Sequence, residues 1–279
     1  SKRTITIDLK GHTYTVINPT VGSSGTETNG FQLLKGSTVT IKNGTIKPGT
    51  SAAKILFQNY CNLTLENVTI DCSGSNCQYV SSNNFGNTVI RNSTLIAANN
   101  QAAFDVYYWP SNGYGDGVSV TVEGNSVIKG RIEYGSDGTE SGKADVAKKA
   151  SLIIKDGEFT GSIQTSKLGT DGVANITITG GTFSAKPNDA YIAPNHECVD
   201  NNNGTYTVKQ LESKLVVEGS FDEDAGAVTG SLDGAVGDNG AAVGDKTDSE
   251  ITGNNTAGIS KDVSVSLTTG SNAATTTLT

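Results

Sequence analysis

The sequence predicts an all-β protein folded as a parallel β-helix, and three observations support that prediction. A short pattern of alternating apolar residues recurs seven times. Near-constant intervals separate the copies, and most copies contain a central Asn or Gly, which tolerates the left-handed backbone angles of a tight bend. Because a strand with two or three inward apolar residues cannot bury its face alone, stacked coils are the fold that such a repeat favours.

The repeated pattern places apolar residues on both sides of the bend. The clear copies are VTIKNGTI (39–46), LTLENVTI (63–70), TVIRNSTL (88–95), VTVEGNSV (120–127), LIIKDGEF (152–159) and ITITGGTF (176–183), and IDLKGHTY (7–14) is a weaker first copy. One apolar residue of each copy serves as an anchor: Leu9, Ile41, Leu65, Ile90, Val122, Ile154 and Ile178. The anchors lie 32, 24, 25, 32, 32 and 24 residues apart. A period near 24 residues fits one coil and the longer intervals fit a coil with an insertion, so we expect about seven rungs.

An antiparallel β-sandwich is the main alternative, because its strands also alternate apolar and polar residues. A sandwich does not require one strand–bend–strand pattern at near-fixed spacing, so the repeat favours the solenoid. The last copy is followed by AYIAPNHECVDNNNGTYTV (190–208). We expect this segment to cap the end of the coil, whose strand edge would otherwise be exposed.

Charge divides the chain in two. Residues 1–211 carry equal numbers of acidic and basic side chains, whereas residues 212–279 carry the whole net charge of −8. We therefore expect a β-helix with its cap over 1–211, and an acidic, linker-like Gly/Ser/Thr-rich extension containing short β-strands over 212–279. Two phrases of the extension, GAVGDNG and AAVGDK, offer oxygen ligands for Ca²⁺ but match no established calcium motif.

Composition disfavours two classes of partner. The acidic balance argues against nucleic acid, whose phosphates require basic patches. No apolar run approaches the roughly 18 residues that a membrane-spanning helix needs.

The final segment, DVSVSLTTGSNAATTTLT (262–279), predicts strand, turn and strand. We expect its last strand to be an edge that another module or subunit completes, or the end of a cut chain.

The ending of the predicted coil resembles that of a known family. Its matching residues are Gly180, Gly181, Thr182, Phe183, Ser184, Pro187, Tyr191, Gly204, Thr205, Tyr206, Thr207 and Val208. This GGTFS…GTYTV ending is typical of extracellular β-helix proteins of gut-dwelling Firmicutes, and the preceding copies are similar to the pectate-lyase-like right-handed β-helix superfamily. The resemblance covers residues 1–211. It implies a right-handed coil and a secreted or cell-surface location, and it carries over no catalytic residue.

One insertion is rich in aromatic residues. The segment AAFDVYYWPSNGYGDG (102–117) holds Tyr107, Tyr108, Trp109 and Tyr114 in a Gly- and Asn-rich setting. Exposed aromatic rings stack on the apolar faces of sugars, and loops on a rigid scaffold commonly carry binding sites. These four residues are therefore the candidate ligand-binding site. In the alternative, Phe104, Tyr107 and Trp109 alternate along a strand and pack as core or cover a groove.

An enzymatic site is weakly supported. The carboxylates and arginines that β-helix polysaccharide-cleaving enzymes would need are scattered: Asp71, Asp105, Asp116, Glu133, Asp137, Arg91 and Arg131. The two histidines, His12 and His196, lie at opposite ends of the predicted coil, which argues against a His-centred triad or metal site. We therefore assign no catalytic residue, no metal and no cofactor.

The four cysteines leave two alternatives open. Cys72 and Cys77 flank the short stretch SGSN, which is compatible with a small disulfide loop in an oxidising compartment. Cys61 precedes a predicted strand and Cys198 lies in the predicted cap. Free buried thiols fit the spacing equally well. No pair has the CxxC spacing of a zinc site.

The functional expectation is a non-catalytic secreted or cell-surface module. It would act as a spacer or adhesin that presents its aromatic loop to glycans or to host and cell-surface molecules. A polysaccharide lyase or glycoside hydrolase is the first alternative, and carboxylates clustered on one face of adjacent rungs would support it. A subunit of a surface filament, assembled through the C-terminal strand, is the second alternative, and a last strand without a partner in its own chain would support that one.

Overall fold

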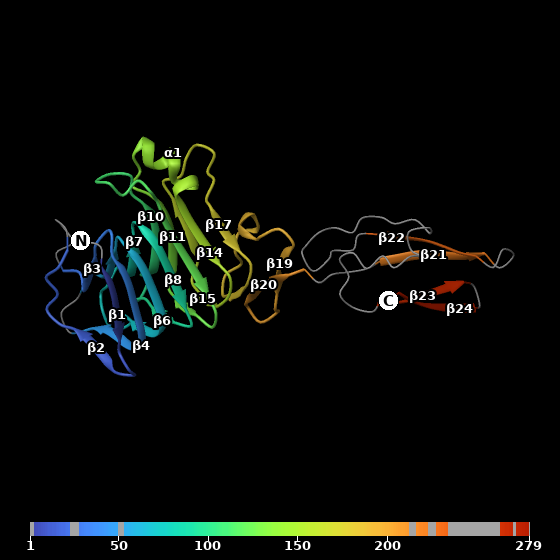
Figure 1. Cartoon of the computed structure of the whole chain (residues 1–279), viewed down its shortest axis with the longest axis horizontal. Coiled ribbons are helices and arrows are strands. Elements are labelled where there is room, and N and C mark those ends of the chain that lie inside the picture. The colour runs from blue at the N-terminus through green and yellow to red at the C-terminus, as the bar shows by residue number, and fades with distance from the viewer. Residues whose placement is uncertain are drawn as a thin grey trace. The chain divides into compact units, whose positions relative to one another are not determined.

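The first part of the chain is a right-handed β-solenoid of about six turns, whose coils stack in parallel (Figure 1). The computed structural model describes residues 3–22, 28–49 and 53–211, and the backbone of four strands between 216 and 278. The chain divides into two compact units, residues 1–210 and 211–279. The predicted parallel β-helix is thus confirmed.

Three stacks of parallel strands build the solenoid. The first contains β1 (Thr4–Asp8), β4 (Thr38–Pro48), β6 (Asn62–Asp71), β8 (Gly86–Arg91), β11 (Val118–Glu123), β14 (Ala150–Ile154) and β17 (Ile176–Ile178). The second contains β2 (Thr13–Val16), the later halves of β4 and β6, β9 (Thr94–Ile96), β12 (Val127–Lys129), β15 (Glu158–Thr160) and β18 (Gly181–Phe183). The third contains β3 (Phe31–Leu33), β5 (Ile55–Asn59), β7 (Tyr79–Asn83), β10 (Ala102–Tyr108), β13 (Arg131–Ser136) and β16 (Ile163–Ser166).

One buried row of apolar side chains runs along the first stack. Ile41, Leu65, Ile90, Val122, Ile154 and Ile178 are paired in register from strand to strand, and each is fully buried. Six of the seven predicted anchors are therefore confirmed. The seventh, Leu9, is wrong, because Ile7 is the residue that pairs with Ile41. The bend of the first copy holds two extra residues, Lys10 and Gly11, both at positive φ, which shift the earlier strand by two positions.

Asparagines form the tight bends between the first two stacks. Asn43, Asn67 and Asn92 adopt φ values of 58°, 51° and 49°, in the left-handed region that Asn tolerates. Their side chains also join the coils, since Asn67 Nδ2 donates to Asn43 Oδ1 at 3.0 Å and Asn43 Nδ2 donates to Asp8 Oδ1 at 3.2 Å. A bend asparagine therefore fixes both the direction of its own chain and the position of the next coil.

A row of alternating charges lines the outer side of the first stack. Its members occupy one register position on successive coils: Asp8, Lys42, Glu66, Arg91, Glu123 and Lys155. Glu123 sits between two cations, with Oε1 2.7 Å from Arg91 Nη2 and Oε2 3.1 Å from Lys155 Nζ. The bond from Arg91 and that from Lys155 hold the pKa of Glu123 below its usual value. Opposite charges directly across a strand pair favour this register over a shifted one.

An antiparallel segment closes the C-terminal end of the coil. β18 pairs with β20 (Tyr206–Gln210), and β20 pairs in turn with β19 (His196–Asp200). The short helix η1 (Asp189–Tyr191) lies between β18 and β19 in the chain. This is the segment that the sequence predicts as the cap.

An insertion between β13 and β14 forms α1 (Glu140–Lys149). Thr139 is its N-terminal capping residue, because the Thr139 hydroxyl accepts a hydrogen bond from the Gly142 amide at 3.0 Å.

The described backbone of the second unit forms two antiparallel strand pairs. β21 (Val216–Asp222) pairs with β22 (Ala227–Asp233), and β23 (Val263–Thr269) pairs with β24 (Asn272–Leu278). Both predicted strands at the C-terminus are therefore present, and the last strand has a partner in its own chain; the predicted turn between them lies outside the described residues. The GAVGDNG and AAVGDK phrases lie outside the described residues.

The bend asparagines can be tested by substitution. Asn67→Ala is expected to lower the free energy of unfolding by about 2 kcal/mol, because Ala is strained at positive φ and the bond to Asn43 is lost. Asn67→Gly keeps the backbone angle and loses only the side-chain bond, so it should cost about 1 kcal/mol or less. Urea denaturation measures both values. Equal losses for the two variants would contradict a backbone role for Asn67.

Candidate functional site

The predicted aromatic residues do not form one exposed surface. Along β10 the side chains of Phe104, Val106 and Tyr108 face the core, and Tyr108 is 3% exposed. Tyr108 is therefore a core residue, which corrects its assignment as a ligand-binding residue. Of the three residues in the alternative, Phe104 packs in the core, whereas Tyr107 lies on the opposite face of β10, because successive strand residues point to opposite faces. Tyr107 and Trp109 are half-buried, and their role in binding stays a prediction.

Tyr114 is held against the solenoid by other rings. It stacks on Tyr60 with 4.7 Å between ring centroids and packs at a tilt against Phe85 at 5.6 Å. Lys35 extends over the Phe85 ring, 4.3 Å from its centroid, and pairs with Asp116 at 3.3 Å. These contacts fasten the loop after β10 to the coils and occupy one face of the Tyr114 ring.

The structure brings three of the scattered charged residues together. Asp105 on β10 and Glu133 on β13 are paired in register on adjacent coils, and Arg131 lies at the start of β13. The other candidates lie elsewhere: Arg91 is in the outer charge row, Asp116 pairs with Lys35, and Asp71 and Asp137 accept hydrogen bonds within their own turns. Stacking in register, rather than any local motif, creates the cluster.

Protein donors surround both carboxylates. Asp105 Oδ2 accepts a hydrogen bond from Ser82 Oγ at 2.8 Å, and its Oδ1 accepts one from the Asn83 amide at 2.6 Å. Glu133 Oε1 accepts from Arg131 Nε at 2.5 Å, and its Oε2 accepts from Tyr79 Oη at 2.6 Å. Burial raises the pKa of Asp105 to about 8, although its two hydrogen bonds oppose the shift. Asp105 is therefore mostly neutral at pH 7.

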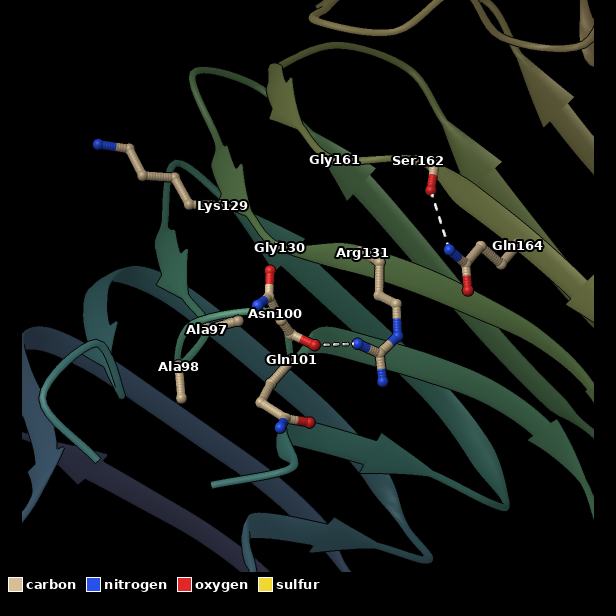
Figure 2. Close-up of a pocket in the computed structure, with 10 residues that line it drawn as sticks. All are labelled: Ala97, Ala98, Asn100, Gln101, Lys129, Gly130, Arg131, Gly161, Ser162 and Gln164. Atoms are coloured by element: carbon tan, nitrogen blue, oxygen red, sulfur yellow. Dashed lines mark hydrogen bonds between the residues drawn. The ribbon is translucent and has the colours of Figure 1, made fainter. Parts of the chain in front are cut away.

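A groove of about 460 Å³ opens beside this cluster, at the corner where the second stack turns into the third (Figure 2). We call it the corner groove. It is lined by Ala97, Ala98, Asn100, Gln101, Lys129, Gly130, Arg131, Gly161, Ser162 and Gln164.

The groove exists because successive corners differ in length. Five residues, 97–101, join β9 to β10, whereas Gly130 alone joins β12 to β13 and two residues join β15 to β16. The shorter corners turn on Gly130 and Gly161, with φ values of 135° and 130°. A Cβ on Gly130 would lie 2.5 Å from the Ala97 Cβ, and one on Gly161 would lie 2.4 Å from the Gly130 oxygen. Only glycine fits at these two close approaches.

The lining of the corner groove is cationic and polar. Arg131 supplies a positive charge that Glu133 partly balances, and the exposed Lys129 side chain extends away from the other lining residues (Figure 2). Neutral donors and acceptors come from Asn100, Gln101, Ser162 and Gln164. No carboxylate belongs to the described lining. Arg131 is fixed in place, because its Nη1 donates to the Asn100 carbonyl while its Nε is bound to Glu133; Figure 2 shows the contact with Asn100 and the bond from Gln164 to Ser162.

Arg131 is the one lining residue that the sequence singles out as a candidate. A usable signal was nevertheless present, since IKGRI (128–132) and FTGSI (159–163) share an apolar residue, a central Gly and an Ile. That shared pattern marks two tight corners in succession.

Comparison with known proteins gives no relative: no family model matches the sequence, and neither a curated protein nor a solved structure matches it. Within the described residues, no helix is both long and apolar enough to span a membrane. The same part of the chain contains no group of three or more His, Cys, Asp or Glu side chains placed to hold a metal ion.

Gly130 is expected to be essential for the corner. Gly130→Ala should lower the free energy of unfolding by roughly 2 to 3 kcal/mol, because the methyl group meets Ala97 and the backbone angle is strained. Gly113→Ala is the matched control, since Gly113 also has positive φ but open space around its Cβ position. Urea denaturation measures both losses. A comparable loss in both variants would show that the close approach at Gly130 contributes nothing.

Asp105 should make stability depend on pH. Its folded pKa lies above its ordinary value of 3.8, so its stabilising contribution is complete below about pH 4 and is lost as the pH rises through 8. Asp105→Asn stays neutral, and the melting temperature of the wild type should therefore fall relative to this variant between pH 4 and 8. Asp116→Asn, at an exposed position, is the control. Parallel melting profiles for wild type and Asp105→Asn would contradict the raised pKa.

Proposed function

We propose that the protein is a non-catalytic secreted or cell-surface module that binds acidic polysaccharide in the corner groove. The observation that carries the proposal is the lining, in which Arg131 and four neutral polar side chains stand together without a carboxylate among the described lining residues, while the Lys129 side chain extends away from them (Figure 2). A planar guanidinium pairs with a sugar carboxylate through two parallel hydrogen bonds. Amide and hydroxyl side chains suit sugar hydroxyls.

The shape of the groove supports a chain ligand over a single sugar. Its lining comes from the corners of three successive coils, which span about 10 Å along the solenoid axis. The groove is open to solvent, so a polysaccharide has room to enter without being threaded. Arg131 needs little ordering on binding, because Glu133 and the Asn100 carbonyl already hold it.

Binding is favoured over cleavage by the state of the two carboxylates. All four carboxyl oxygens of Asp105 and Glu133 accept hydrogen bonds from the protein, and neither residue belongs to the groove lining. Cleavage of a polysaccharide is the second candidate, because a neutral carboxyl beside a second carboxylate is the arrangement that general acid–base chemistry uses.

Retention on immobilised polysaccharide tests the proposal. The wild type should be retained on polygalacturonate at low salt, released by added salt, and not retained on neutral dextran. Lys129→Ala combined with Arg131→Gln should weaken binding about tenfold or more. Lys47→Ala combined with Lys149→Gln, at exposed positions on β4 and α1 outside the groove lining, removes the same number of positive charges and should bind like the wild type.

The outcomes separate the candidate sites and functions. Undiminished retention of the groove variant would overturn the assignment to the corner groove, and loss of retention in Trp109→Ala alone would assign binding to the aromatic loop. New reducing or unsaturated ends in the wild-type incubation, absent with Asp105→Asn, would establish cleavage instead. Matched melting temperatures for the variants exclude unfolding as the cause.

A further inference from the structure

The corner before β7 places two thiols together. Cys72 directly follows the last residue of β6, and one residue, Gln78, separates Cys77 from β7. The SGSN stretch forms the turn between the two cysteines. The Cys72 carbonyl accepts from the Ser75 amide at 3.0 Å and from Ser75 Oγ at 2.8 Å. Ser75 Oγ in turn accepts from the Cys77 amide at 3.2 Å. These three bonds draw the two cysteine backbones toward each other.

Both side chains turn inward from this corner. Cys72 is 0% exposed and Cys77 is 1% exposed, and both belong to the apolar core. The structure holds them as free thiols. We propose that Cys72 and Cys77 form an intramolecular disulfide that closes the SGSN loop when the protein meets an oxidising disulfide compound.

The other two cysteines lie in different surroundings. The Cys61 thiol donates to the Asn62 carbonyl at 3.4 Å, and burial raises its pKa to about 11. Cys198 lies on cap strand β19, at the far end of the coil from β5 and β6. A thiol reacts as its thiolate, so Cys61 is disfavoured as the attacking group. The Cys72–Cys77 pair therefore has no competing partner of comparable geometry among the described residues.

The chemistry requires one oxidant, a small-molecule disulfide such as oxidised glutathione. The neighbouring Cys72 side chain lowers the pKa of the Cys77 thiol, so the Cys77 thiolate attacks one glutathione sulfur and releases the first glutathione as its thiolate, which takes up the proton that Cys77 lost. Cys72 then loses its proton, its thiolate attacks the Cys77 sulfur, and the second glutathione leaves and takes up that proton. The protein loses two hydrogens, and the oxidant gains them. Ser73, Gly74 and Asn76 are exposed, so opening of this turn gives the oxidant access.

Mass mapping of the whole chain tests the proposal. The purified protein is incubated with oxidised glutathione, alkylated under denaturing conditions, and digested with a protease that cleaves after glutamate. Cleavage after Glu66 and Glu123 places Cys72 and Cys77 alone in peptide 67–123, while Cys61 and Cys198 fall in other peptides. Peptide 67–123 should be two hydrogens lighter and free of alkyl groups, and Cys61 and Cys198 should each carry one. The oxidised protein should also melt at a higher temperature than the reduced protein.

Matched variants identify which cysteines are joined. Cys198→Ser should leave the loss of two hydrogens from peptide 67–123 unchanged, whereas Cys77→Ser should abolish it. Two alkyl groups on peptide 67–123 of the oxidised wild type would overturn the proposal. So would a stable glutathione adduct on Cys72 or Cys77, or a crosslink from either residue to Cys61 or Cys198.

Discussion

Every coil of this solenoid must place its inward apolar residue directly over the one before it. The row from Ile41 to Ile178 is fully buried only because six successive strands keep the same register. A shift of one residue would turn each of these side chains toward solvent. The bend asparagines and the outer charge row act on the same constraint, the first by fixing where the chain turns and the second by pairing opposite charges between coils.

The same constraint leaves the corners free to vary. Register is fixed by stacking, whereas the connection between the second and third stacks varies: in three successive coils it is the five residues 97–101, Gly130 alone, and two residues, and the connection 72–78 has seven. A long corner next to two short ones produces a step, and the corner groove is that step. Solenoids concentrate variation in such positions because a corner can change without disturbing the buried row.

Sequence alone predicts the repeated part of this structure and misses what depends on register. Six anchors could be predicted because each copy carries the same apolar spacing, but Leu9 could not be separated from Ile7 without knowing that Lys10 and Gly11 lengthen the first bend. Tyr108 has the chemistry of a sugar-binding residue, and only the phase of β10 shows that it faces the core. Asp105 and Glu133 are far apart in sequence, and only the pairing of β10 with β13 brings them together.

Amide hydrogen exchange in the presence and absence of oligogalacturonate tests most directly whether the stepped corner is the binding site. We expect slower exchange at saturating ligand in segments 97–101, 129–131 and 161–164, which are remote in sequence and joined only by stacking. Slowed exchange confined to residues 107–117, or no change in any segment while the ligand is bound, would contradict binding in the corner groove.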